Sequence, residues 1–190
     1  MYTRSLQFAI FSLAWMLLGA TLLSAQSVAS AYGNKSSLWI GGEYANLQAG
    51  FPKDSSVRIS GIGASLDYNW RAHLGLEAHA RFLDWASWHG QTEHSYLAGP
   101  RYTFLNNRKW RPFVAFDLGI TQMHYPFSLG DGNSFTLAPR AGIEYKLNRK
   151  LKLQATYEAD LLTNSPDFTN EPNFGIHPNG LIVGAAWRIY

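Results

Sequence analysis

The chain has 190 residues, with 16 Lys and Arg against 13 Asp and Glu, and it contains no cysteine. Charged residues make up 15% of the sequence, below the roughly 25% of a typical soluble domain. The lack of cysteine excludes disulfide frameworks, thiolate metal sites and cysteine nucleophiles. A net charge of +3 without a basic helix argues against nucleic-acid binding, and the length allows one domain.

The N-terminus carries the longest apolar run. Arg4 and the free amine precede apolar residues 8–23, and small residues follow. The run is shorter than the ~20 residues that span a bilayer, and no stop-transfer charges follow it. The alternative is a retained membrane anchor. The pattern predicts a cleaved secretory signal peptide over residues 1–31, with cleavage between residues 25 and 31, and an exported domain over residues 32–190.

From residue 36 onward, apolar and polar residues alternate with a period of two, which predicts strands. The expected strands cover residues 37–47, 57–70, 74–82, 93–104, 111–122, 135–147, 151–161 and 176–189. Pro100 and Pro139 fall inside two of them. Because proline lacks a backbone N–H, we expect both to lie at bulges or weak pairings.

The connections between these strands alternate in length. Short polar turns are expected at residues 71–72, 106–109 and 148–150. Longer connections, rich in Gly, Pro, Asn, Asp and Ser, are expected at residues 48–56, 84–92, 124–133 and 163–175. This order predicts an all-β fold, an eight-stranded antiparallel up-and-down barrel with one short-turn end and one long-loop end.

Alternation alone leaves open whether the apolar face points inward, as in a lipocalin, or outward against lipid. The polar face mixes charges with glycines such as Gly61 and Gly63, and small residues fit a narrow lumen. The apolar face carries aromatic residues near strand ends, where the two membrane interfaces would lie. These are Tyr68, Trp70, Phe82, Tyr96, Tyr102, Phe104, Tyr145 and Trp187. We therefore expect a transmembrane barrel.

The polar face then becomes a charged lumen. Its acids are Glu43, Asp67, Glu77, Asp117, Glu144, Glu158 and Asp160, and its bases are Arg81, Arg101, Arg140, Lys146, Lys152 and Arg188. An isolated charge is costly in a poorly hydrated space, so mutual pairing is expected, with Arg101 and Arg140 most central. We interpret the set as a salt-bridge plug, and the alternative is an ion or proton pathway.

Four motifs carry a family resemblance. They are Gly41-Gly42-Glu43-Tyr44, Leu76-Glu77-Ala78-His79-Ala80-Arg81-Phe82, Tyr96-Leu97-Ala98-Gly99-Pro100-Arg101-Tyr102 and Ala141-Gly142-Ile143-Glu144-Tyr145-Lys146-Leu147-Asn148. Over residues 36–190 the chain resembles the small eight-stranded outer-membrane β-barrels of Gram-negative bacteria, the OmpA/OmpX-like barrel-domain group. The resemblance implies a monomer in outer-membrane lipid and lipopolysaccharide, without a cofactor. It also implies delivery by periplasmic chaperones and the barrel-assembly machinery.

One functional hypothesis is a non-enzymatic barrel with a structural or surface-interaction role through its long loops, because binding concentrates on loops held by a rigid scaffold. Exposed aromatic rings often mark contacts, although the same rings could instead complete the outer girdle. The contact candidates are Trp85, Trp88, Tyr125 and Phe127, and the same loops also carry Phe51, His89 and Phe168.

Two other hypotheses remain. A lipid A-modifying barrel enzyme needs Ser, His and an acid together on the outward face. The candidate groupings are His94 beside Ser95, His124 near Ser128 and Ser134, and His177 with Ser165. Adjacent residues of one strand point to opposite faces, so the first of these cannot pair. A small pore or ligand-binding barrel would need an open lumen, which the charges argue against. We predict no catalytic, cofactor or metal site.

Overall fold

The computed structural model describes residues 36–51, 54–85, 90–105, 108–125, 130–163 and 177–189. The predicted signal peptide over residues 1–31 and the C-terminal residue 190 lie outside these residues. The described strands are β1 (Ser37–Phe51), β2 (Asp54–Asn69), β3 (Leu74–Trp85), β4 (Thr92–Thr103), β5 (Trp110–His124), β6 (Asp131–Lys146), β7 (Leu151–Ala159), β8 (Leu161–Thr163) and β9 (Asn179–Arg188). Within the described ranges, no helix is long and apolar enough to cross a membrane.

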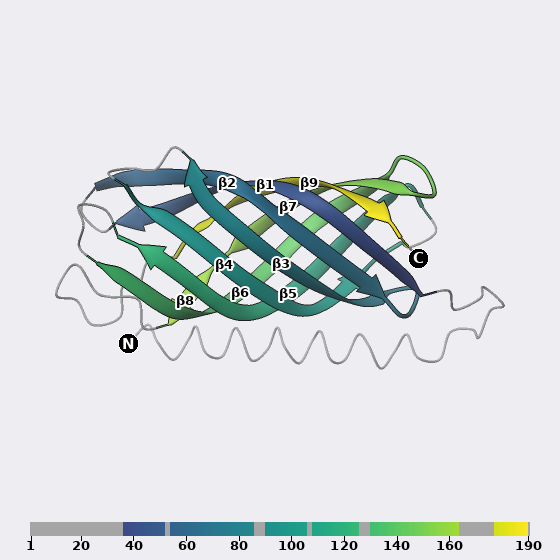
Figure 1. The fold of residues 1–190 in the computed structure, drawn as a ribbon. Helices are drawn as coiled ribbons and strands as arrows, with labels where there is room; N and C mark the ends of the chain where they lie inside the picture. The colour runs from purple at the N-terminus through teal and green to yellow at the C-terminus, as the bar shows by residue number, and fades with distance from the viewer. Residues whose placement is uncertain are drawn as a thin grey trace, which may run out of the picture. The chain divides into compact units, whose positions relative to one another are not determined.

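The strands form one closed sheet. Each strand pairs antiparallel with its neighbours, β1 pairs with both β2 and β9, and the pairing of β5 with β6 completes the ring (Figure 1). The short β8 continues the line of β7, because both pair with β6 in one register. Counting β7 and β8 as one, the nine segments make the eight-stranded antiparallel barrel that the sequence predicts.

The break between β7 and β8 has a physical cause on the facing strand. The register runs from Arg140 opposite Glu158 to Leu137 opposite Leu161, so Pro139 lies where the pairing stops. Proline has no N–H to donate, and the strand is interrupted there. Pro100 also interrupts a pairing. The β4–β5 ladder has no paired residues between Ala98 and Arg101, and Pro100 lies in this gap. The expected weak pairing at both prolines is confirmed.

The expected connection over residues 48–56 is wrong. β1 continues to Phe51 and β2 begins at Asp54, because the hairpin pairing extends through Gln48 with Arg58 and Ala49 with Val57. Here continued hydrogen bonding to the neighbouring strand overrides the loop-like composition. The last strand also begins later than expected, at Asn179 instead of residue 176.

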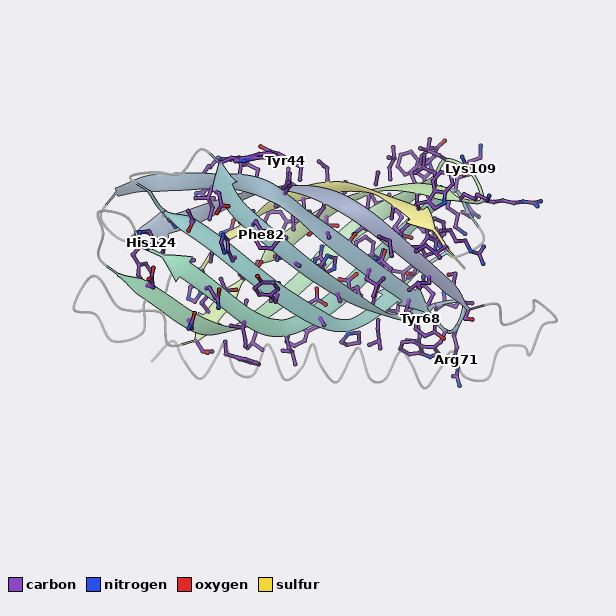
Figure 2. The ribbon with its side chains drawn as sticks, viewed as in Figure 1. Tyr44, Tyr68, Arg71, Phe82, Lys109 and His124 are labelled. Carbon is purple, nitrogen blue, oxygen red and sulfur yellow. The ribbon has the colours of Figure 1, made fainter. Side chains whose placement is uncertain are left out.

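The outward face is apolar, as the sequence predicts for a membrane barrel. Outward residues such as Leu76 and Ile120 are 50% and 54% exposed, whereas the intervening Glu77 and Asp117 are 2% and 0% exposed. Aromatic pairs lie near both ends of the strands. Trp110 and Tyr145, with ring centroids 4.5 Å apart, lie near the short-turn end, and Phe82 and Tyr96, 6.1 Å apart, lie nearer the other end. Figure 2 labels Phe82 on the same side of the barrel as His124, away from Lys109.

Two apolar clusters lie in the lumen towards the long-connection end, beside buried polar side chains such as Gln91, Glu93 and Thr136. Ala45, Leu47, Ile59, Leu83 and Ile182 form one buried cluster. Met123, Tyr125 and Leu162 form a second. Charged side chains fill the middle of the lumen and continue towards the short-turn end, where the ring of Trp39 lies 5.2 Å from the Lys152 ammonium. The barrel is therefore filled by side chains, as expected at this strand number.

The face assignment yields a depth-dependent prediction. Leu118 lies in the middle of β5 and faces outward, so Leu118→Arg should cost about 2–4 kcal/mol of folding free energy in lipid. Leu76 lies near the short-turn end of β3, so Leu76→Arg should cost less. Urea-dependent folding into phospholipid vesicles measures both values, and equal losses at the two sites would contradict the assigned depths.

Candidate functional site

Strand alternation sends the predicted lumen charges to the inside of the barrel. Lys146 and Arg188 are half-buried, near the short-turn end. The other members of the predicted set are buried, and they are Glu43, Asp67, Glu77, Arg81, Arg101, Asp117, Arg140, Glu144, Lys152, Glu158 and Asp160. Two arginines, Arg101 and Arg140, hold most of these groups together.

Arg101 lies at the centre of the cluster nearer the short turns. Its guanidinium is 2.7 Å from the Glu144 carboxylate, 3.0 Å from Glu77 and 3.5 Å from Asp67. The same guanidinium covers the Phe113 ring at 3.6 Å from the centroid. The Lys152 ammonium binds Asp67 at 2.5 Å and also contacts Glu144. This cluster therefore joins β2, β3, β4, β6 and β7.

Arg140 lies at the centre of the second cluster. Its guanidinium is 3.0 Å from Glu77, 3.1 Å from Asp117 and 2.8 Å from Glu158. Glu158 also pairs with Arg81, which lies 3.7 Å from Glu43. Since Glu77 binds both Arg101 and Arg140, the two clusters form a single ion-pair network.

Three further buried titratable side chains were not among the predicted charges. His79 lies with its Nδ1 atom 3.1 Å from Glu43 and its Nε2 atom in contact with Arg140. Arg111 binds Glu144 at 2.5 Å, and Glu93 is fully buried. The alternation already contained the signal, because Glu93 shares its strand parity with Arg101, and Arg111 shares its parity with Asp117. His79 likewise shares its strand parity with Glu77 and Arg81.

Acids outnumber bases among the buried charges that the structure describes. The eight acids are Glu43, Asp67, Glu77, Glu93, Asp117, Glu144, Glu158 and Asp160, and the five bases are Arg81, Arg101, Arg111, Arg140 and Lys152. The near balance expected from sequence included Lys146 and Arg188, which lie closer to solvent. Arg81, Arg101, Arg140 and Lys152 each pair with two or more carboxylates, so losing one of these bases would take a counter-ion from several buried carboxylates.

One part of the network has the composition of a metal site. Asp67, Glu77 and His79 each offer a ligand atom, and these atoms lie within 4.8 Å of one another. However, Arg101 already lies 3.5 Å from Asp67 and 3.0 Å from Glu77. A guanidinium neutralises and hydrogen-bonds the two carboxylates in the place where a metal cation would act. We therefore assign this cluster to the ion-pair network.

The aromatic contact candidates differ in exposure. Trp85 is 52% exposed at the end of β3, and its ring lies 6.4 Å from that of Tyr44. Tyr125 is only 3% exposed and packs with Met123 and Leu162, which corrects its expected exposure. Tyr125 follows directly after β5 and keeps the inward parity of Met123. The candidates Trp88 and Phe127 lie outside the described residues.

The histidines proposed for a hydrolase do not meet a serine in the described part of the chain. His94 pairs with Asp84 at 3.0 Å, and His124 pairs with Asp131 at 2.5 Å, on the exposed face. Ser95, by contrast, is buried inside the barrel. The alternation of the strand separates nucleophile and base. The other grouped serines are Ser134, which is also buried, and Ser128 and Ser165, which lie outside the described residues.

The network predicts a large effect of losing one arginine. Arg140→Met would leave Glu77, Asp117 and Glu158 without a shared cation, at a cost of about 3–5 kcal/mol. Adding Asp117→Asn should recover part of that loss, so the pair should be non-additive. The exposed Arg58 is a control, since Arg58→Met should change stability by no more than about 0.5 kcal/mol. Urea titration in vesicles measures these three variants and the single variant Asp117→Asn, and an additive double variant would contradict the coupling.

Solved structures share this architecture. Neisserial surface protein A is 15% identical, with a TM-score of 0.65 over 80% of this chain and 98% of that one. The N-terminal β-barrel domain of Pseudomonas aeruginosa OprF is 14% identical, with a TM-score of 0.55 over 80% and 96%. Ail, the attachment invasion locus protein of Yersinia pestis, is 15% identical, with a TM-score of 0.54 over 80% and 97%. At these identities the likeness shows the fold.

Sequence comparison supplies the family. No curated protein matches the chain. A family model described as the outer membrane protein beta-barrel domain matches residues 16–188. This match spans most of the chain and includes every strand of the closed barrel. The chain therefore belongs to the outer membrane protein beta-barrel domain family, whose place is the bacterial outer membrane.

Proposed function

We propose that this chain is a non-enzymatic, non-conducting outer-membrane scaffold. The observation that carries the proposal is the ion-pair network across the lumen. Arg81 on β3 pairs with Glu158 on β7, and these strands face each other across the ring of eight. Lys152 on β7 pairs with Asp67 on β2, and Arg140 on β6 pairs with Glu77 on β3. These ion pairs connect non-adjacent strands of the barrel and occupy the lumen through which ions would have to pass.

The apolar clusters support a closed lumen. Leu47, Ile59 and Leu83 lie inside the barrel on the long-connection side of the two central arginines, and Tyr125 and Met123 lie at the same end. Glu93 is buried there as well, opposite Leu83. The two clusters fill part of the lumen, so an ion approaching from this side would lose part of its water among apolar side chains, which is costly. The apolar clusters thus add to the ion-pair network in opposing conduction.

We further propose that the end with the long connections supplies surface contacts. Trp85 is an exposed ring held next to Tyr44 on a rigid sheet, where a ring can bind with little loss of conformational entropy. Outer-membrane lipid and lipopolysaccharide would surround the barrel, which we propose acts as a monomer. Delivery would use the predicted signal peptide, periplasmic chaperones and the barrel-assembly machinery.

Planar-bilayer recording tests the closed lumen. The chain, shown to be folded by heat-modifiable gel migration, should give no stable channels. Arg101→Ser combined with Arg140→Ser should produce cation-selective events, because two guanidinium groups leave and an excess of acids remains. Reproducible channels from the unaltered folded chain would overturn the proposal and move the function towards transport.

A lipid-hydrolysis assay tests the non-enzymatic assignment. The purified barrel should release no fatty acid from lipid A or phospholipid, and His94→Ala and His124→Ala should be indistinguishable from the parent chain. The physical reason is that each imidazole pairs with an aspartate but meets no serine within the described ranges. Fatty-acid release that one of these substitutions abolishes would contradict the assignment.

A further inference from the structure

Exposed basic residues gather at two neighbouring turns of the short-turn end. Arg108 and Lys109 precede β5, and Arg149 and Lys150 precede β7, and all four are exposed. None of them makes an ion pair with another described residue. The turns touch, because the Lys146 N–H donates to the Lys109 carbonyl at 2.9 Å. Residues 104–110 and 147–151 contain no acid, so this corner of the barrel is strongly positive.

The turn that holds Arg149 and Lys150 is well defined. The Asn148 side-chain oxygen accepts hydrogen bonds from the backbone N–H groups of Lys150 at 2.7 Å and Leu151 at 2.8 Å. This side-chain cap fixes the backbone of the turn. The two cations are therefore presented at its tip without ordering a flexible loop first.

A groove of about 870 Å³ lies on the outward face below this corner. Small residues form its floor, namely Gly42, Ala155 and Ala185, between larger side chains that include Tyr145 and Val183. These positions face outward by strand parity, so the groove opens towards the membrane. Its lining also includes inward-facing residues of the barrel wall, among them Glu43 and Gln154. Its apolar lining suits a hydrocarbon chain.

The strand register gives the direction of the groove. Trp110 pairs with Tyr145, Tyr145 with Leu153, Leu153 with Ala185, and Ala185 with Gly42. Trp110 is the first residue of β5, next to Lys109, whereas Gly42 lies well inside β1. Because strands of a barrel are tilted, a row of paired residues runs obliquely to the barrel axis. The groove therefore extends from the basic corner towards the middle of the membrane.

We propose that this groove and its basic corner bind one anionic phospholipid. The phosphate contacts Arg108, Lys109, Arg149 or Lys150, and one acyl chain lies in the groove. The rings of Trp110 and Tyr145, tilted at 46° with centroids 4.5 Å apart, mark the interface between headgroup and hydrocarbon. Short turns of such barrels face the periplasm, so the lipid comes from the periplasmic leaflet. A second copy of the chain is disfavoured as occupant, because its own basic corner would meet this one.

Lipid retention by the full chain tests the site. Native mass spectrometry would follow the purified barrel in detergent with equal amounts of phosphatidylglycerol and phosphatidylethanolamine. We expect one phosphatidylglycerol to be retained in preference. Each of Arg108→Gln, Lys109→Gln, Arg149→Gln and Lys150→Gln should weaken that retention by about five-fold. High salt should act in the same direction, whereas Arg108→Lys combined with Arg149→Lys should retain the lipid.

Filling the groove tests the acyl-chain half of the site. A Cβ atom at Gly42 would meet only the Gly63 carbonyl oxygen, at 3.9 Å, so Gly42→Leu fits the fold. This substitution should lower retention of both lipids, because the leucine side chain would occupy the place of the lipid's acyl chain. Two matched controls, Ala98→Leu and Arg71→Gln, should leave lipid retention unchanged. Ala98 lies on the outward face of β4, outside the groove. Arg71 lies at the short-turn end but away from Lys109 (Figure 2).

Four results would overturn the proposal. They are equal retention of the two lipids, retention unchanged in a variant lacking all four cations, equal effects of Gly42→Leu and Ala98→Leu, and a dimer of the chain that Gly42→Leu dissociates. The last result would assign the groove to a second copy. All of these readouts are independent of whether the lumen conducts ions.

Discussion

The narrow interior of an eight-stranded barrel governs the arrangement of this molecule. The lumen is just wide enough for side chains, so an inward-facing charge cannot keep a full shell of water and must find its counter-ion on another strand. Arg140 shows the result, since its guanidinium reaches Glu77, Asp117 and Glu158 on three different strands. Strand alternation then gives the outward face its character, because the residues between the lumen-facing charges point to the lipid side and are mostly Leu, Ile, Val and aromatic residues.

Strand parity made much of this arrangement predictable. Once Leu76 and Ala78 were placed outside, Glu77 and Arg81 had to lie inside, and the same reasoning placed Arg101 and Arg140. Individual partners could not be read in this way, because they depend on the stagger of the closed sheet. Arg81 meets Glu158 only after β1 has paired with β9, and no local pattern encodes that offset.

The failures have local physical reasons. The region around Gly50 and Pro52 has loop composition, yet the β1–β2 hairpin extends to Phe51 because its partner strand offers continuous hydrogen bonds. Tyr125 follows a strand end and was assigned to a loop, yet it continues the inward parity of Met123 and packs on Leu162. The lipid-facing groove could not be predicted from the sequence, because Gly42, Ala155 and Ala185 become neighbours only through the register of three strands.

The long sequence separation of the ion pairs bears on how the barrel assembles. Lys152 and Asp67 are 85 residues apart, and Arg140 and Glu77 are 63 apart. In a sheet that has not yet closed, these side chains stay hydrated on a water-compatible surface. Arg140 can pair with Asp117 and Glu158 on the strands beside its own, whereas pairs that span the ring need the sheet to curve. Closing the ring is therefore the step at which the ring-spanning pairs lose their water.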